Sequence, residues 1–337
     1  AIYPYGRNRS GNAEDGMKSI GAWLGATLLA LTVAAPAEAD FQAWLKELRA
    51  EAAGKGISDA TLDAALNGIK PIPRVIELDR KQPEFTLTFE QYMKRVVPRS
   101  RVEKGRKKFA ENKALLTEVS KKFGVPPQFL VAFWGIETDF GRVTGGFKVI
   151  DALATLAYDG RRSKFFRREL HLALKIIDGG HIKADVMVGS WAGAMGQPQF
   201  MPSSFVGYAV DYDKDGRKDI WKTRADVFAS AANYLSSYGW RASERWGRRV
   251  NVPEGFDPKG ADLKVRKTVS GWAAEDVTRA NGSPLPNSDL DASVIMPAGA
   301  GGPAYLVYNN YRVIMRWNRS HYFAMAVGRL ADQIAGQ

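Results

Sequence analysis

The chain has 337 residues, of which 45% are hydrophobic and 25% are charged, and its formal net charge is +12. This composition is that of a globular protein with a substantial core, and it excludes a chain that is mostly disordered. The basic balance indicates an acidic polymer or an anionic surface as the partner, although the same charges could form an ordinary solvated face. The sequence contains no cysteine, which excludes disulfides and a lipid carried on an N-terminal cysteine.

The first 39 residues have the order of an export signal. Met17 and Lys18 precede an apolar run over residues 20–35, and small residues follow at Ala37 and Ala39. This order is typical of a secretory signal peptide, so we expect cleavage near Ala39 and a periplasmic protein without an integral membrane segment. Export also argues against nucleic acid as the partner.

Helical periodicity dominates the chain from there to about residue 240. Two short helices are predicted between Phe41 and Gly68, and basic helical segments are predicted over residues 86–123. Between them, residues 71–85 contain three prolines, which remove backbone donors and predict an extended linker. Further helices are predicted over residues 147–159, 163–180 and 223–240.

The later part of the chain changes texture. Residues 189–205 are too rich in Gly and Pro for a plain helix and predict a loop of the kind that often holds binding groups. Residues 241–313 form short alternating runs broken by turn residues, which predict a small strand-rich lobe. A closing helix is predicted over residues 321–336. The fold class predicted is mainly α with a small β lobe.

Glu137 stands out because it lies in a helical run of bulky apolar residues, "VAFWGIETDFG". Leu130, Phe133 and Trp134 lie seven, four and three residues before it, so all four side chains share one helix face. A carboxyl group on a buried face tends to stay protonated near neutral pH and can then donate a proton. The alternative is a structural residue near a helix end at Gly141, with only its stem packed.

The stretch "DYDKDGRKDIW" has the spacing of a calcium loop. Acidic residues occupy the first, third, fifth and ninth positions and a glycine the sixth, whereas the twelfth is a lysine instead of the usual glutamate. Asp226, at the start of the next helix, is the nearest substitute. The alternative is an acidic turn in which Asp226 only caps a helix. The candidate ligands are Asp211, Asp213, Asp215, Arg217 and Asp226, for Ca²⁺ or Na⁺.

Aromatic and amide side chains form a second candidate set. Trp191, Trp317 and Tyr322 could stack on sugar rings, whereas Gln199 and Asn318 could bind hydroxyl or acetamido groups. Ordinary packing explains each of these aromatics equally well when it is taken alone.

Other chemistries fit the sequence less well. The three histidines are widely spaced, and no phosphate loop is present, so neither a zinc site, a histidine triad nor an organic cofactor is indicated. Asp139 lies two residues beyond Glu137 and faces the other side of a helix, whereas a conventional glycosidase needs two carboxylates across the scissile bond. If Glu137 acts alone, the substrate must supply the nucleophile.

Several stretches together resemble the lytic murein transglycosylases of the membrane-bound B type. They are "GIETDFG", "VIDALATLAYDGRRSKFF", "GSWAGAMGQPQFMPSSFVGYAVDYDKDGRKDIW", "ANYLSSYGW" and "RWNRSHYFAMAV". The resemblance implies a helical lobe over residues 40–125 joined by 320–337, a lysozyme-like core over 126–240 that contains the loop 211–226, and a β lobe over 241–319.

The resemblance also implies an activity. These enzymes cleave the β-1,4 bond between N-acetylmuramic acid and N-acetylglucosamine in peptidoglycan without water, and they leave a 1,6-anhydromuramoyl end. Glu137 matches the family's single catalytic glutamate, which acts first as acid and then as base. The positions that match groove or stem-peptide contacts are Tyr92, Arg161, Arg162, Ser190, Gln199 and Asn318. Cell-wall synthases are further candidate partners.

One departure concerns the groove. The family usually has tyrosine directly before "AMAV", whereas this chain has Phe323 there and Tyr322 one place earlier, which leaves one sugar contact open. The competing functions are a catalytically silent peptidoglycan-binding scaffold, a hydrolase with reducing products, and a basic protein that binds anionic surface polymers. Product analysis on purified cell-wall sacculi separates them.

Overall fold

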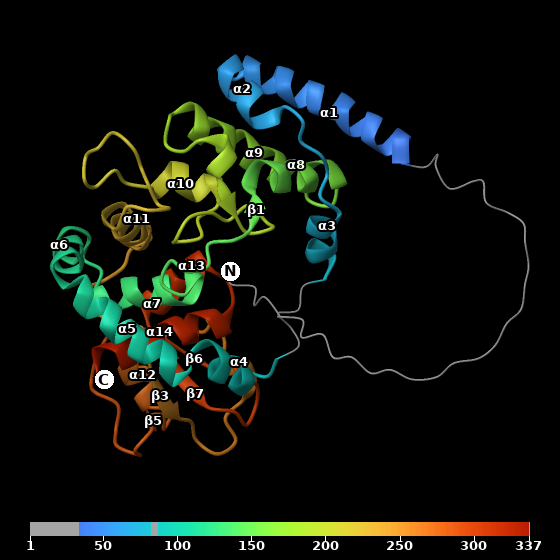
Figure 1. Ribbon diagram of the computed structural model, residues 1–337. Coiled ribbons are helices and arrows are strands. Elements are labelled where there is room, and N and C mark those ends of the chain that lie inside the picture. Colours follow the sequence, from blue (N-terminus) through green and yellow to red (C-terminus); the bar gives the residue numbers. More distant parts are fainter. Residues whose placement is uncertain (1–33, 82–86, 337) are drawn as a thin grey trace, which may run out of the picture.

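The computed structural model describes residues 34–81 and 87–336 (Figure 1). Most of the predicted signal segment therefore lies outside the described residues. Helices dominate and a small antiparallel sheet completes the fold, which confirms the fold class predicted from the sequence. None of the described helices combines the length and the apolar character that a bilayer span requires.

The N-terminal half of the described chain is a succession of helices. They are α1 (Ala34–Gly54), α2 (Asp59–Leu66), α3 (Pro73–Arg80), α4 (Phe89–Val96), α5 (Arg99–Glu111), α6 (Lys113–Phe123) and α7 (Pro127–Thr138). The two helices predicted between Phe41 and Gly68 are confirmed. The first begins earlier than predicted and passes through the expected cleavage position at Ala39, because its alanine-rich start favours helix and proline is tolerated in a first turn.

Helix α3 shows that the linker predicted over residues 71–85 is wrong for its described part. Pro73 occupies the first helical position, where a missing N–H costs nothing, and the helix runs on to Arg80. The backbone N–H of Ile72, just before it, donates to Thr155 Oγ1 at 3.0 Å. Pro73 therefore starts a helix here, and this helix packs against α8 (Val149–Asp159), the helix that carries Thr155.

The C-terminal half combines helices with short strands. Its helices are α8 (Val149–Asp159), α9 (Ser163–Asp178), α10 (Pro202–Tyr208), α11 (Arg224–Ser237), α12 (Val269–Ala273), α13 (Asn309–Trp317) and α14 (His321–Ala335), with short 3₁₀ turns η2 (Ala184–Val186) and η3 (Pro258–Gly260). Its strands are β1 (Phe147–Lys148), β2 (Val188–Gly189), β3 (Gly247–Asn251), β4 (Lys267–Thr268), β5 (Thr278–Arg279), β6 (Asp291–Ile295) and β7 (Ala304–Val307).

The predicted strand-rich lobe is confirmed as a five-stranded antiparallel sheet. Its strand order is β4-β6-β7-β3-β5, and Gly247 of β3 lies opposite Val307 of β7. The lobe has a small core of its own, which includes Trp272 and Leu306. The prediction extended this lobe to residue 313, but α13 already begins at Asn309, because its buried residues repeat at helical and not at alternate spacing.

A second and larger core joins the helices from both ends of the chain. It runs from Phe41 to Ile334 and includes residues of α7 and α14, which pack against each other at the centre of the molecule (Figure 1). Helix α14 confirms the predicted closing helix and also contacts α4 and α5. The junction of α13 and α14, at Asn318, is thereby held beside α7, the helix that carries Glu137.

Candidate active site and acidic loop

Helix α7 buries Glu137 as the sequence predicts. Pro127 occupies its first turn, and every residue from Phe129 to Thr138 is buried. Only 2% of Glu137 is exposed, and Leu130, Phe133 and Trp134 are buried beside it. The helix stops at Asp139, whose φ is +50°, and Asp139 Oδ2 forms ion pairs with Arg142 and Lys104. This second acid is therefore directed to partners of its own.

The carboxyl group of Glu137 meets a residue from the far end of the chain. Trp317 Nε1 donates a hydrogen bond to Glu137 Oε1 at 2.9 Å. The Trp317 ring also packs on Phe133, with ring centroids 4.5 Å apart, and contacts Phe200 and Tyr234. The sequence placed Trp317 among sugar-stacking candidates, but the structure uses it to hold the carboxyl group.

The C-terminal end of α7 is fixed by Gln197. Trp134 Nε1 donates to Gln197 Oε1 at 2.7 Å, and Thr138 Oγ1 donates to the Gln197 carbonyl at 2.9 Å. Gln197 Nε2 in turn donates to the Trp221 carbonyl at 2.7 Å. Because these groups are buried, each bond replaces one that water would otherwise make. The backbone that presents Glu137 is thus tied to the loop that follows β2.

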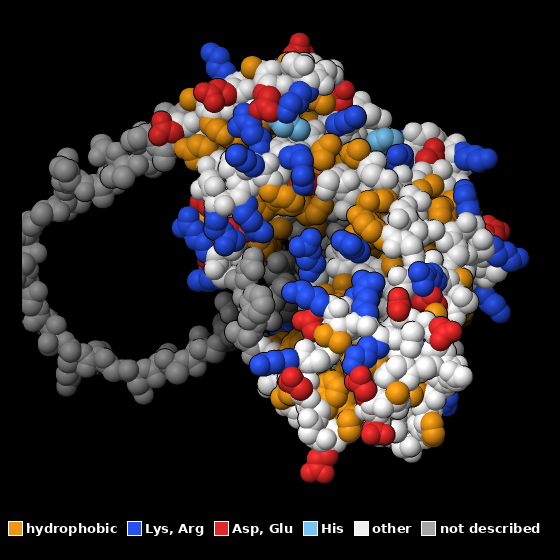
Figure 2. Space-filling view, turned by 180° about the vertical axis from the view of Figure 1, so that it is seen from behind, with side chains coloured by type: hydrophobic (Ala, Val, Ile, Leu, Met, Phe, Trp, Pro, Cys, Tyr) orange, Lys and Arg blue, Asp and Glu red, His pale blue; other side chains and the backbone are white. Residues whose placement is uncertain are grey.

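A cavity of about 620 Å³, the groove cavity, opens beside the α13–α14 junction. Its lining includes Leu87, Ile295, Met296, Asn318, Arg319 and Tyr322. Asn318 directly follows Trp317, so the cavity adjoins the residue that holds Glu137. Figure 2 shows lysine and arginine side chains around a hollow in the middle of one face, with apolar side chains between them.

Two predicted groove residues, Tyr92 and Tyr322, lie together. Their ring centroids are 5.4 Å apart, and Tyr322 also contacts Phe89 at 5.3 Å. Phe323, by contrast, is 2% exposed and packs toward Phe133 in the core. The tyrosine one place earlier than the family pattern is therefore the one that lines the cavity.

The loop that contains Ser190, Trp191 and Gln199 is held by hydrogen bonds within the loop and to the segment that precedes β1. Ser190 Oγ accepts from the backbone of Ala194 at 3.1 Å, and Gln199 Nε2 donates to the Thr144 carbonyl at 3.0 Å. Trp191 is only 4% exposed, so the structure presents little of its ring for stacking on a sugar.

Gly145 allows its own segment to lie close against the backbone of β2 and of Ser190. A Cβ on Gly145 would lie 1.9 Å from the Gly189 carbonyl oxygen and 2.6 Å from the Ser190 nitrogen, and its φ is +113°. Only glycine fits such a contact without moving the backbone. The position of Ser190 thus depends on a residue that carries no side chain.

Arg161 and Arg162 converge on a buried acid that the sequence analysis missed. Arg161 Nε donates to Asp79 Oδ2 at 2.7 Å, and Arg162 forms an ion pair with Asp79 Oδ1. The Asp79 side chain is 2% exposed, whereas those of the arginines are 49% and 42% exposed. Burial alone would raise the pKa of Asp79, but the two guanidinium groups outweigh it and hold that pKa below its ordinary value.

We expect Asp79→Asn to lower the free energy of unfolding by about 1–2 kcal/mol at neutral pH, because two half-exposed cations lose their counter-charge. Since the pKa of Asp79 is lower in the folded state, its stabilisation is fully present above the ordinary carboxyl range. It is lost as the pH falls through the folded-state value. Urea unfolding at neutral pH and well below roughly pH 4 measures this difference, which disappears in acid.

Asp159→Asn is the matched control for that variant. Asp159 forms an ion pair at 2.9 Å with Arg80, whose side chain is 65% exposed. We expect a loss below about 1 kcal/mol there, because solvent screens the pair. Equal losses for both variants, or an Asp79 effect that persists in acid, would contradict the argued role of the buried acid.

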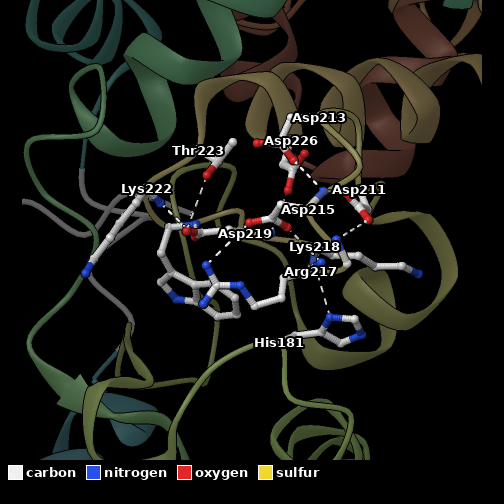
Figure 3. A network of polar contacts seen from close by, with 12 residues as sticks. His181, Asp211, Asp213, Asp215, Arg217, Lys218, Asp219, Lys222, Thr223 and Asp226 are labelled. Atoms are coloured by element: carbon white, nitrogen blue, oxygen red, sulfur yellow. Dashed lines mark hydrogen bonds and ion pairs between the residues drawn. The ribbon is translucent and has the colours of Figure 1, made fainter.

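The acidic loop folds around its own backbone (Figure 3). Asp211 accepts hydrogen bonds from the backbone N–H groups of Asp215 and Gly216, at 3.1 and 3.0 Å. Asp226, which is fully buried, accepts from the backbone of Tyr212 and of Asp219, both at 2.7 Å. The carboxylates are thus placed by turns and by the start of α11.

Three of the predicted ligands meet, and one does not. Oxygen atoms of Asp211, Asp213 and Asp226 lie within 4.8 Å of one another, an arrangement that fits a hard cation. Burial raises the pKa of Asp226, and its acidic neighbours raise it further. Asp215 is not in this convergent set, and its carboxylate accepts from the Arg217 backbone at 2.8 Å. That Arg217 contributes a ligand to the ion stays a prediction.

Residues 40–332 match the family described as "Transglycosylase SLT domain". The chain is 32% identical over 251 residues to membrane-bound lytic murein transglycosylase B of Escherichia coli K12, a match that covers 73% of this chain and 67% of that protein.

Two solved structures extend the comparison. SltB3 of Pseudomonas aeruginosa, in complex with NAG-NAM-pentapeptide, matches with a TM-score of 0.86 and 44% identity over 88% of this chain and 80% of that one. Lytic transglycosylase Slt35 of Escherichia coli, in complex with calcium, matches with a TM-score of 0.75 and 30% identity over 86% of this chain and 92% of that one.

Proposed function

Since the chain belongs to the transglycosylase SLT domain family and is a lytic murein transglycosylase, we propose both the bond that it cleaves and the residue that cleaves it. The bond is the β-1,4 linkage between N-acetylmuramic acid and N-acetylglucosamine. The residue is Glu137. The observation that carries the proposal is a buried carboxyl group held by Trp317, whose chain neighbour Asn318 lines the groove cavity together with Tyr322.

The reaction needs one carboxyl group in two successive roles. Glu137 first donates its proton to the oxygen that leaves C1 of the muramoyl sugar, and that C–O bond breaks. The C6 hydroxyl of the same sugar then attacks C1 and returns its proton to the carboxylate, which closes the 1,6-anhydro ring. No water is consumed, so the single acid suffices. The Trp317 hydrogen bond fixes how the carboxyl group is oriented during both transfers.

The remaining site residues are assigned around this centre. We propose that Tyr92, Asn318 and Tyr322 contact the glycan, with Ser190, Trp191 and Gln199 on the loop behind it. Arg161 and Arg162 would meet the anionic stem peptide with the donors that Asp79 leaves available. Peptidoglycan lies outside the cytoplasm, so this substrate also supports the proposed export to the periplasm.

The acidic loop is proposed to hold Ca²⁺, with Asp211, Asp213 and Asp226 as its ligands. The ion would neutralise three carboxylates that otherwise repel one another and would join the loop to the start of α11. The calcium complex of Slt35 supports this assignment by similarity.

Product analysis of purified sacculi tests the proposed reaction. We expect soluble muropeptides whose muramoyl ends carry the anhydro mass, detected by mass spectrometry after digestion with the full chain. Reducing muramoyl ends would show a hydrolase instead. A digest without soluble products would contradict cleavage and leave only binding.

A further inference from the structure

A second cavity lies beyond Tyr322, between α4, β3 and α14. Its volume is about 1010 Å³, which is larger than that of the groove cavity. Tyr322 lines both cavities, and two pairs of consecutive residues are divided between them. Leu87 and Pro297 face the groove cavity, whereas Thr88 and Ala298 face the second one. The two cavities are therefore neighbours that share the Tyr322 side chain.

The second cavity carries an excess of positive charge. Arg248, Arg249 and Arg329 line it, and we name it the arginine cavity. Within the part of the chain that the structure describes, no carboxylate forms an ion pair with Arg249 or Arg329. The guanidinium of Arg248 lies over the ring of Tyr308, and its buried Nε has no hydrogen-bond partner among the described residues. The guanidinium groups of Arg249 and Arg329 are thus the cationic donors available in this partly enclosed space.

The acids of the same cavity have other partners. Glu90 forms an ion pair with Lys94 at 2.8 Å on α4. Asp332 Oδ2 accepts from Trp246 Nε1 at 2.9 Å, and burial raises the pKa of Asp332, which weakens it as a counter-charge. Arg249 and Arg329 therefore keep their attraction for an external anion.

Aromatic side chains form the wall that faces the groove. The ring of Phe89 lies 6.5 Å from that of Tyr305 and 5.3 Å from that of Tyr322, measured between centroids. Phe89 and Tyr305 are buried, so they support the half-buried ring of Tyr322, which is the aromatic surface open to a ligand. Aromatic faces next to hydrogen-bond donors suit a ligand that has both an apolar ring face and an anionic group. A sugar that bears a carboxylate-containing substituent combines the two.

Resting on the proposed function, we propose that the arginine cavity is a distal subsite. It binds a carboxylate of a stem peptide on the same glycan strand whose scissile bond lies at Glu137. Tyr322 contacts the sugar, and Arg249 and Arg329 contact the carboxylate. The cavity thereby selects strands that still carry their peptides and holds them away from the chemical step.

The test compares the wild-type chain with the double variant Arg249→Gln/Arg329→Gln on two substrates. One is a set of isolated glycan strands with their stem peptides, and the other is the same strands after an amidase has removed the peptides. We expect the KM of the variant to rise about tenfold on stem-bearing strands, with kcat within about twofold. On stripped strands we expect both constants to remain within about twofold of the wild type.

The matched control is Lys46→Gln/Lys121→Gln, which removes two exposed positive charges outside both cavities. A KM rise of the same size in this control would assign the effect to net charge and overturn the proposal. An equal rise on both substrates, or no rise on either, would also overturn it. Inorganic phosphate is added as a competitor, and inhibition by it at millimolar concentration on both substrates alike would mark a phosphate site instead.

Failure of the proposed function would look different. If the wild-type chain released no product from any strand, calorimetry of strand binding would replace turnover. We then expect the wild type to bind stem-bearing strands with a dissociation constant about tenfold lower than that for stripped strands. We expect the double variant to bind both kinds of strand equally. Equal binding of both strand types by the wild type would overturn the subsite.

Discussion

Replacing Glu137 by glutamine should lower kcat on purified sacculi by about a thousandfold, because the amide can neither give nor take the transferred proton. The substitution keeps the size of the side chain, and its carbonyl oxygen can still accept the hydrogen bond that Trp317 Nε1 donates at 2.9 Å. We therefore expect the fold and the binding of glycan to be retained. The release of soluble muropeptides over time measures the rate, and circular dichroism checks the fold.

Asp139→Asn is the matched control for that variant. Asp139 lies two residues from Glu137, and its replacement by asparagine likewise converts a carboxyl group into an amide. Its carboxylate pairs with Lys104 and Arg142 and is not part of the proposed reaction. Asparagine also tolerates the φ of +50° at this position. We expect its rate to stay within about twofold of the wild type. A Glu137→Gln protein that works at the wild-type rate would refute the single-acid mechanism, as would an equal loss in both variants.

The burial of Glu137 was predictable because its surroundings are local in sequence. The spacing of Leu130, Phe133 and Glu137 on one helix needs only the helical repeat. Its hydrogen-bond partner was not predictable, because Trp317 lies 180 residues away and reaches Glu137 only once α13 and α14 have packed beside α7. In the sequence, a tryptophan at the end of a helix is equally consistent with a surface for stacking on sugars and with a core residue.

The error at α3 has a similar cause. Prolines before Arg80 read as a linker, although proline at a first helical position starts a helix. Asp79 was therefore hidden in a segment expected to be extended, and its partners Arg161 and Arg162 were assigned to the substrate alone. A buried acid in a basic protein signals an ion pair only after its burial is known.

In the acidic loop, the spacing of the acids predicted a cluster of carboxylates but not its exact members. The pattern placed Asp211, Asp213 and Asp215 together, since a turn brings alternate residues to one side. In the structure the Asp215 carboxylate accepts a backbone N–H of its own turn, whereas Asp226 from the next helix completes the convergent group. The spacing within the loop can be read from the sequence, but the converging set also depends on where the next helix begins, because Asp226 lies at the start of α11.

Removing calcium should lower the melting temperature of the chain by roughly 5 °C at neutral pH. The expected size follows from a ligand that binds only the folded state and is present at about a hundred times its dissociation constant. The structural reason is the convergence of Asp211, Asp213 and Asp226 within 4.8 Å, where the ion offsets their mutual repulsion. Thermal unfolding in calcium and in a chelator, at equal ionic strength, measures the difference.

Two substitutions separate the ion from the scaffold of the loop. Asp226→Ala leaves the backbone N–H groups of Tyr212 and Asp219 without their acceptor, so it should cost about 2–3 kcal/mol even in chelator and abolish the response to calcium. Asp213 is exposed and, among the described residues, accepts one hydrogen bond, at 3.3 Å, so Asp213→Asn should leave the chelated protein nearly unchanged and still weaken the calcium response.

Asp185→Ala, an exposed acid outside the loop, is the control that should respond to calcium as the wild type does. A wild-type protein whose melting temperature ignores calcium would refute the proposed ion site. An Asp213→Asn protein with the full response would instead remove Asp213 from the ligand set. Because the loop lies between α10 and α11, which reach the same core as α7, the loss of the ion is also expected to reach the Gln197 contacts that hold the end of the Glu137 helix.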